Sequence, residues 1–152
     1  MVFTCKHFDE LSLAELYAAM VLRQMVFAVE QQCSYLDADG KDQASYHLFL
    51  KSDSGELLAY SRLIPTGVAY ADYASIGRVV SHPAHRKEGL GKMIMERSLQ
   101  EMQRLFPGEP IKIGAQEYLK NFYESFGFVD IGHRYIEDGI WHIQMTFVPG
   151  SK

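Results

Sequence analysis

Short runs of apolar residues that alternate with polar ones predict six to seven β-strands in this chain. They are rich in β-branched and aromatic residues, and they lie at residues 2–6, 46–51, 56–64, 73–81 and 111–114. Two tight turns, at 53–55 and 138–139, predict hairpins. After the second turn an apolar set alternates with polar residues, so this last strand should bury one face. That apolar set is Trp141, Ile143, Met145 and Phe147.

A different period, apolar at i, i+3, i+4 and i+7, predicts the first helix. Ser12 and Glu15 form a capping box, in which the serine caps the helix and the glutamate reaches back to it. The apolar set that follows should make this helix amphipathic. Its members are Leu13, Leu16, Tyr17 and Met20. The pattern predicts a helix that continues to about Glu30.

Two further helices are predicted in the second half of the chain. The first runs from about Gly89 to Arg104, and the second carries Leu119, Phe122, Tyr123 and Phe126 and ends at Gly127. Successive strands without a helix between them imply antiparallel pairing, and the crossovers in 89–128 imply a parallel segment. The order of elements predicts a single domain over residues 1–152 with an α/β (α+β) fold. We expect a mixed, twisted sheet of six to seven strands with helices on both faces.

Composition narrows the class of protein. A net charge of −4 argues against general binding to nucleic acid, which requires a basic face. No apolar run approaches the ~18 residues of a membrane span, and residues 1–6 lack the layout of a signal peptide. Cys5 and Cys33 form no disulfide framework, and the six histidines show no metal-binding spacing. We therefore expect a cytoplasmic protein without a membrane partner or a catalytic metal.

The stretch between the fourth predicted strand and the second predicted helix contains the clearest candidate chemistry. Arg86 and Lys87 are followed by Gly89 and Gly91, at the point where the helix begins. Glycines let a ligand approach the backbone, and the free N–H groups of a first helical turn attract anions. This combination predicts a pyrophosphate site.

Other interpretations of this stretch differ in strength. A P-loop would require Ser or Thr after Lys92, where Met93 stands, and a glycine at position 86. A dinucleotide-binding fingerprint would require a G-x-G-x-x-G motif near the start of the chain, which is absent. A tight loop that only starts a surface helix remains open on these residues alone.

Two motifs together resemble the GNAT superfamily of N-acetyltransferases. Residues 79–91, VVSHPAHRKEGLG, resemble its acetyl-CoA loop, and residues 121–128, NFYESFGF, resemble its second signature. The resemblance implies that acetyl-CoA is the cosubstrate and that the acetyl group passes directly to a primary amine of a small molecule or a peptide. It also allows a homodimer. The implied CoA-binding residues are Val79, Val80, Arg86, Lys87, Glu88, Gly89, Leu90, Gly91, Lys92 and Asn121.

The resemblance also assigns roles within these motifs. Tyr123 falls where many members have a tyrosine that acts as general acid toward the leaving thiolate, although a tyrosine on the apolar face of a helix is also typical of a core residue. Asn121 falls where many members have an asparagine that contacts the CoA arm. The strands that contain Val79-Val80 and Ile111–Ile113 should splay apart, which would leave backbone groups of the valines for the pantetheine amides.

Residues 23–42 and the hairpin 137–145 resemble the ElaA-like branch of this superfamily. Ser34, Asp37 and Trp141 depart from the residues usual in that branch, near the implied acceptor side. The resemblance places Arg23, Glu30, Gln31 and Tyr35 around the acceptor pocket. Glu30 and His142 are the candidate bases. Arg23 and Glu30 lie seven residues apart, so a solvated polar stripe on one helix face is the alternative.

Two other functions remain open at this stage. One is a non-catalytic module that binds or senses acyl-CoA, and the other is an enzyme on the same fold that uses a different acyl donor. Cys33 lacks the neighbouring His and helix terminus that would activate a nucleophile, so we expect direct transfer without an acyl-enzyme.

Overall fold

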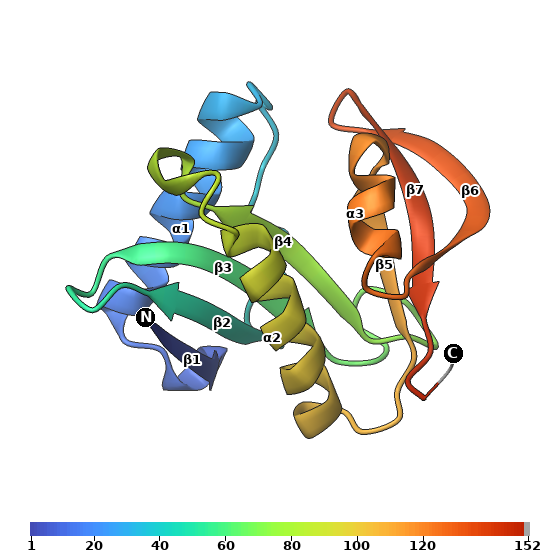
Figure 1. The fold of residues 1–152 in the computed structure, drawn as a ribbon, viewed down its shortest axis with the longest axis horizontal. Coiled ribbons are helices and arrows are strands. Elements are labelled where there is room, and N and C mark those ends of the chain that lie inside the picture. Colours follow the sequence, from blue (N-terminus) through green and yellow to red (C-terminus); the bar gives the residue numbers. More distant parts are fainter. Residues whose placement is uncertain (151–152) are drawn as a thin grey trace.

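The computed structural model of the protein describes residues 1–150, whose seven strands form two sheets (Figure 1). Four antiparallel strands form the first sheet in the order β1-β2-β3-β4, and three form the second in the order β5-β7-β6. The strands are β1 (Val2–His7), β2 (Tyr46–Lys51), β3 (Leu57–Ile64), β4 (Ser75–Ser81), β5 (Ile111–Gln116), β6 (Val129–Glu137) and β7 (Ile140–Phe147). The predicted α/β fold is confirmed.

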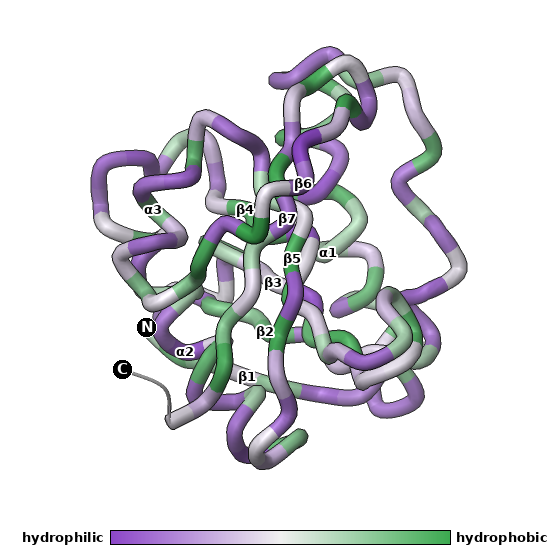
Figure 2. The backbone as a smooth tube through the Cα atoms, turned by 90° about the vertical axis from the view of Figure 1, so that its right-hand side faces the viewer, coloured by the Kyte–Doolittle hydropathy of each residue, from purple (hydrophilic) through white to green (hydrophobic). Residues whose placement is uncertain are grey.

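Helices cover both faces of the first sheet, as predicted. The helix α1 (Leu13–Gln24) packs Ala19 and Leu22 against Phe49 and Tyr60. On the opposite face, α2 (Leu90–Leu105) packs apolar side chains against a larger core that also contains α3 (Lys120–Glu124) and the second sheet. Figure 2 shows hydrophobic segments along the central strands and mostly hydrophilic outer loops.

The start of α1 follows the predicted capping box, but its buried face differs from the prediction. The Ser12 Oγ accepts from the Glu15 N–H at 3.0 Å, and Glu15 Oε1 accepts from the Ser12 N–H at 2.8 Å. Leu13 and Tyr17 are 86% and 74% exposed, so the predicted apolar stripe is not the buried one. The buried set has the same spacing, rotated around the helix, and comprises Ala19, Leu22, Arg23 and Val26.

The buried face of α1 differs from the predicted one because of an ion pair, which the spacing of apolar residues in the sequence cannot show. Arg23 is fully buried because Asp37 and Asp42 neutralise its charge. Small Ala19, on the same face, permits close approach to the sheet. After Gln24 the chain continues as a π-helical segment, Met25–Glu30, so the predicted length of the helical region is correct.

The two sheets meet at one point and then diverge. Ala74 forms a parallel bridge with Ile111, where the Lys112 N–H donates to the Ala74 carbonyl at 2.9 Å. Within residues 1–150 no further ladder joins β4 to β5, and Figure 1 shows the two strands separating above this bridge. The splay that the family resemblance implied is therefore present, and the predicted parallel segment is reduced to a single bridge.

A bulge interrupts β4 on the side of this opening. Tyr60 pairs with Val80 and Arg62 pairs with Gly77, so Ser61 alone faces two residues, Arg78 and Val79. Arg78 has φ +50°, in the left-handed region that non-glycine residues rarely adopt. The bulge thus disturbs the ladder where the strands separate.

The last hairpin has the predicted two-residue turn, with φ +53° at Asp138 and +75° at Gly139. Ile143 and Met145 are buried as predicted. The alternation fails toward the tip, because Trp141 is 43% exposed and stacks on the Arg134 guanidinium. Its neighbour His142 is buried instead.

None of the helices within residues 1–150 combines the length and the apolar character that crossing a bilayer would require.

Candidate active site

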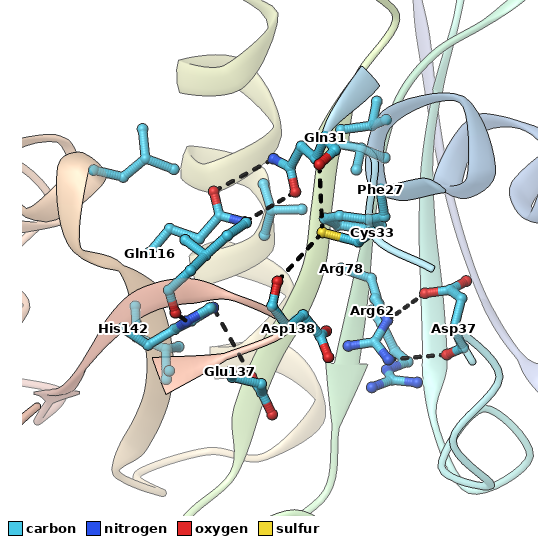
Figure 3. Close-up of a pocket in the computed structure, with 18 of the residues that line it drawn as sticks. Phe27, Gln31, Cys33, Asp37, Arg62, Arg78, Gln116, Glu137, Asp138 and His142 are labelled. Carbon is cyan, nitrogen blue, oxygen red and sulfur yellow. Dashed lines mark hydrogen bonds and ion pairs between the residues drawn. The ribbon is translucent and has the colours of Figure 1, made fainter. Parts of the chain in front are cut away.

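A cleft of about 670 Å³ occupies the opening between β4 and β5. One wall is formed by β4, the end of the first helical region and the loop that follows it. The other wall is formed by β5, α3, the 138–139 turn and the strands β6 and β7 beside it, and side chains from both walls point into the space between them (Figure 3). Nine of the predicted site residues line this cleft: Glu30, Gln31, Tyr35, Val79, Val80, Arg86, Gly91, Tyr123 and His142.

The amino end of α2 opens beside this cleft with unpaired backbone donors. Gly89 caps the helix in the left-handed region at φ +76°, and no side chain caps it. The first intrahelical bond runs from the Met93 N–H to the Gly89 carbonyl, so the three N–H groups before it have no acceptor in the helix. Together with the helix dipole, these groups can bind an anionic group.

The predicted CoA-binding residues divide into two groups. Val79, Val80, Arg86 and Gly91 line the cleft. Lys87, Glu88, Gly89 and Lys92 are exposed beyond its rim, and the Leu90 side chain is buried in the core, so that residue offers only its backbone. Asn121 is exposed on α3 and does not line the cleft.

Arg86 was predicted to bind CoA and Glu30 to act on the acceptor, but the two side chains bind each other. The Arg86 Nη1 and Nη2 atoms donate to the two Glu30 carboxylate oxygens at 2.9 and 2.7 Å. Both oxygens of Glu30 therefore already accept hydrogen bonds from a cation. Neither oxygen is free to face an acceptor in the cleft unless Arg86 moves away.

Tyr123 is buried in the core cluster and also lines the cleft. Burial raises the pKa of its phenol to about 12, so the hydroxyl stays protonated at neutral pH. Within the described residues, this hydroxyl has no hydrogen-bond partner, and it is not among the polar atoms sealed from solvent. The ring is thus held by packing while the O–H is free for a molecule in the cleft.

His142 has one ring nitrogen fixed by the backbone. Its Nδ1 lies 2.8 Å from the Ile140 carbonyl oxygen, which can only accept, so Nδ1 carries the proton of the neutral ring. The other nitrogen, Nε2, then has a free lone pair, and its nearest charged neighbour is Glu137 at 3.9 Å. The ring stacks on Tyr135 at 5.5 Å between centroids. Its geometry is that of a positioned base.

Arg23 lies elsewhere than predicted. It is 0% exposed and does not line the cleft, so neither the acceptor-binding role nor the solvated stripe fits it. Its Nε donates to Asp37 at 2.8 Å and its Nη1 to Asp42 at 2.8 Å. Arg23 therefore holds the loop that follows the first helical region.

This ion pair belongs to a network that the sequence did not reveal. Arg62 from β3 pairs with Asp39 and Asp42, and Arg78 from β4 pairs with Asp37 and Asp39. Burial opposes ionisation of Asp42, but hydrogen bonds from the arginines lower its pKa overall. The sequence did contain one signal of this network. Arg62 is a charged residue inside the apolar strand 57–64, and a buried charge needs a partner of opposite charge.

Two contacts cross the cleft from wall to wall. Gln31 and Gln116 exchange amide hydrogen bonds at 3.2 and 3.4 Å, and Cys33 Sγ lies 3.7 Å from the Asp138 carbonyl oxygen (Figure 3). Burial, and then the charge of Asp138, raise the pKa of Cys33, which disfavours a thiolate. Tyr35 is 61% exposed at the rim.

Gly114 on β5 has a steric role that sequence reasoning missed. A Cβ there would overlap the Tyr135 hydroxyl, so any larger residue would displace that ring from its place in the cleft. Within residues 1–150, no group of three or more potential metal ligands occurs.

Comparison of the sequence with known proteins identifies one family. The profile of the "Acetyltransferase (GNAT) domain" matches residues 23–148. Protein ElaA of Escherichia coli is 42% identical over 143 residues, which cover 92% of each chain.

Solved structures agree with the sequence matches. An acyl-CoA N-acyltransferase from Pseudomonas aeruginosa has a TM-score of 0.90 and 44% identity, covering 97% of this chain and 100% of the other. E. coli ElaA has a TM-score of 0.88 and 38% identity, covering 97% and 99%. An aminoglycoside 6'-N-acetyltransferase solved with coenzyme A has a TM-score of 0.72 at 15% identity, covering 100% and 99%, and shares the fold alone. The chain belongs to the GNAT acetyltransferase family, with ElaA among its relatives.

Proposed function

We propose that the protein transfers an acetyl group from acetyl-CoA to the primary amine of a small molecule or a peptide. The observation that carries this proposal is the cleft itself. It brings a β4 bulge and a free tyrosine hydroxyl together, close to the unpaired amino end of α2. A structural neighbour of the same fold was solved with coenzyme A, which supports a CoA-type cosubstrate.

The amino end of α2 would bind the CoA pyrophosphate. Its free N–H groups and the left-handed backbone at Lys87 and Gly89 leave concave space for an anion. Arg86 adds a guanidinium, which would have to share or leave Glu30. The pantetheine arm would then follow Val79 and Val80, where β4 has lost its neighbour on the cleft side.

At the bulge, a backbone N–H that the ladder does not use would polarise the thioester carbonyl. The amine nitrogen forms a bond to the carbonyl carbon, and the C–S bond breaks to release CoA thiolate. His142 Nε2 would accept the proton that the amine loses. The remaining candidate, Glu30, is occupied by Arg86.

Tyr123 would donate a hydrogen bond to the leaving thiolate. A phenol with a pKa of about 12 is a weaker acid than a thiol, whose ordinary pKa is about 8.5. Its main contribution is therefore stabilisation of the developing charge, with full proton transfer completed as the product leaves. Either role requires the hydroxyl to point into the cleft.

The test is release of free CoA from acetyl-CoA in the presence of amino acids, polyamines, peptides and aminoglycosides. An acetyltransferase should release CoA well above the rate of hydrolysis with at least one amine, in the presence of EDTA as well as in its absence. Binding of acetyl-CoA without release would favour a non-catalytic acyl-CoA module. Competition with longer acyl-CoA compounds would show whether acetyl is the preferred group. We expect this reaction in the cytoplasm.

A further inference from the structure

Arg78 occupies an unusual backbone position on the floor of the cleft. It has φ +50° within the β4 bulge, directly before Val79. Non-glycine residues in this region tend to occur at functional sites, and bulges commonly re-aim a side chain. Arg78 lines the cleft and is 28% exposed.

Gly77, the preceding residue, leaves space beside Arg78. Its φ is outside the left-handed region, so the backbone does not require glycine there. A Cβ would meet Ile64 at 3.8 Å and Arg62 at 4.0 Å, which are ordinary contacts, so packing does not require glycine either. The space that this glycine leaves lies on the cleft wall and is open to a ligand.

The Arg78 guanidinium is fixed on one side and free on the other. Its Nε donates to Asp37 Oδ1 at 2.7 Å, and its Nη2 donates to the Asp37 carbonyl at 2.9 Å and to Asp39 Oδ2 at 3.3 Å. Its Nη1 donates to no residue within 1–150. The unused NH₂ group is thus held in place before any ligand arrives, which reduces the entropy lost on binding.

The other two arginines of the network cannot play this part. The Arg23 side chain is 0% exposed and the Arg62 side chain 3%. The Nε of Arg62 also lacks a partner, but it is sealed from solvent and cannot reach a ligand. Nη1 of Arg78 is absent from the sealed atoms, so solvent reaches it.

The charges around Arg78 favour an anion. Arg23, Arg62, Arg78 and Lys41 supply four positive charges, against three negative charges on Asp37, Asp39 and Asp42. On the opposite wall, the Glu137 side chain is 60% exposed, and its one ion-pair partner within residues 1–150 is His142, at 3.9 Å (Figure 3). The two walls therefore present opposite charge to a molecule between them.

We infer that Arg78 binds a carboxylate of the acceptor, and that the acceptor is an amino acid whose ammonium group faces His142 and Glu137. This inference rests on the proposed function, because it concerns the acceptor side of the same cleft. A carboxylate would accept from the two Nη1 hydrogens, as charge-assisted hydrogen bonds. The amine would then lie beside the bulge at Val79.

The test compares carboxylates with their uncharged amides on the complex with CoA. The probes are the N-acetyl derivatives of glycine, β-alanine and γ-aminobutyrate and the three matching amides, titrated by NMR. Each pair has almost the same size and differs in charge. We expect at least one acid to bind at least tenfold more tightly than its amide. Arg78→Met should abolish this preference, and Arg78→Lys should reduce it.

Arg104→Met is the matched control, because Arg104 is exposed on α2, pairs with Glu101 and does not line the cleft. It should keep the preference for the acid. Equal affinity of acid and amide at all three chain lengths would overturn the inference, as would a preference that persists in Arg78→Met. If Arg78→Met fails to fold because Asp37 loses one of its two arginine partners, the comparison of acid and amide in the wild-type protein and in Arg78→Lys decides.

Failure of the inference can be told apart from failure of the proposed function. CoA release with amines that lack a carboxylate, and equal release with amino acids and their amides, would leave the acetyltransferase intact and refute the role of Arg78. A preference for acids that depends on Arg78, without CoA release for any amine, would support the binding site and refute the enzyme.

Discussion

Tyr123 and Tyr60 are both buried, and burial raises the pKa of each to about 12. They differ in what their hydroxyl groups contact. The Tyr60 hydroxyl lies 2.6 Å from His47 Nδ1 in the core, whereas the Tyr123 hydroxyl has no partner within residues 1–150 and borders the cleft. The same substitution at these two positions therefore separates catalysis from stability.

Tyr123→Phe should lower kcat by ~10²-fold or more, because it removes the proposed donor to the leaving thiolate and keeps the packing of the ring. The melting temperature should change little, since no internal hydrogen bond is lost. CoA affinity should persist, because the amino end of α2 is unchanged. Thermal melting, CoA titration and kcat on one preparation give the answer.

Tyr60→Phe is the matched control and should behave in the opposite way. Loss of a buried hydrogen bond should cost on the order of 1 kcal/mol of unfolding free energy, with kcat per folded molecule retained. Full kcat in a folded Tyr123→Phe variant would refute the assignment and leave the thiolate to solvent.

The base can be tested with a second pair of substitutions. His142→Asn keeps an N–H donor within reach of the Ile140 carbonyl but removes the Nε2 lone pair, so kcat should fall by roughly 10²- to 10⁴-fold. His133→Asn, on the exposed part of the same hairpin, should leave kcat unchanged. Both are measured by steady-state CoA release. Equal activity of the two variants would return the role of base to Glu30 or to water.

At the scale of elements, the sequence predicted positions better than orientations. The capping box fixed the start of α1, because Ser12 and Glu15 act locally. The prediction of which face of that helix is buried was wrong, because two stripes of residues, rotated around the helix from each other, have the same spacing. The choice between them depends on Arg23 meeting Asp37 and Asp42, which lie far along the chain. Turn residues are also local, and the Asp138-Gly139 hairpin was predicted correctly.

The amino end of α2 gives a test at this scale. Gly91 is the second residue of the helix, and a Cβ there would meet only Phe122, at 3.8 Å. Gly91→Val should thus fold with a nearly unchanged melting temperature without ligand. Its branched side chain would occupy the cleft beside the free N–H groups, so CoA affinity should fall at least tenfold, about 1.4 kcal/mol, by calorimetry.

Ala14→Val is the matched control for this substitution. Ala14 is likewise the second residue of its helix, is exposed on α1 and does not line the cleft. It should leave CoA affinity unchanged. Gly91→Val with wild-type affinity would show that the pyrophosphate binds elsewhere.

For the whole molecule, the half of the cleft proposed to bind CoA was easier to recognise in the sequence than the half proposed to bind the acceptor. The proposed CoA half depends on one continuous stretch, residues 79–91, whose candidate chemistry can be read in chain order. The acceptor half is assembled from Arg62, Arg78, the 37–42 loop and the 138–139 turn, which separate strands bring together. No rule of sequence spacing connects those segments. The charge network and the space at Gly77 and Gly114 could therefore be recognised only in the structure.

The same network predicts how stability depends on pH. Burial lowers the pKa of His47, and the charges of Arg23 and Arg62 act in the same direction against its contacts with Asp42. In the unfolded chain this histidine titrates at about pH 6.5. As the pH falls, the unfolded state takes up the proton first, so this contribution to stability is present above pH ~6.5 and is lost below it.

Asp39 and His85 also contribute to the pH dependence of stability, but they change the effect of His47 little. Burial opposes ionisation of Asp39, but the hydrogen bond from Arg62 lowers its pKa overall, so its contribution is lost only below pH ~4. The hydrogen bond that the His85 ring donates to the Glu88 carboxylate raises the pKa of His85, which stabilises the fold below pH ~6.5. His85 lies at the surface, where water screens such pairs, so it should offset little of the effect of His47.

The unfolding free energy, measured in urea, should therefore decline from about pH 7 to about pH 5, before the carboxylates of the network titrate. His47→Gln should be less stable at neutral pH, because it disturbs the bonds to Tyr60 and to the Asp42 carbonyl, and its stability should be nearly flat over this range. His133→Gln, at an exposed position, should retain the decline. A decline that survives in His47→Gln would mean that another group takes up the proton, and that the buried network does not set the acid limit of this fold.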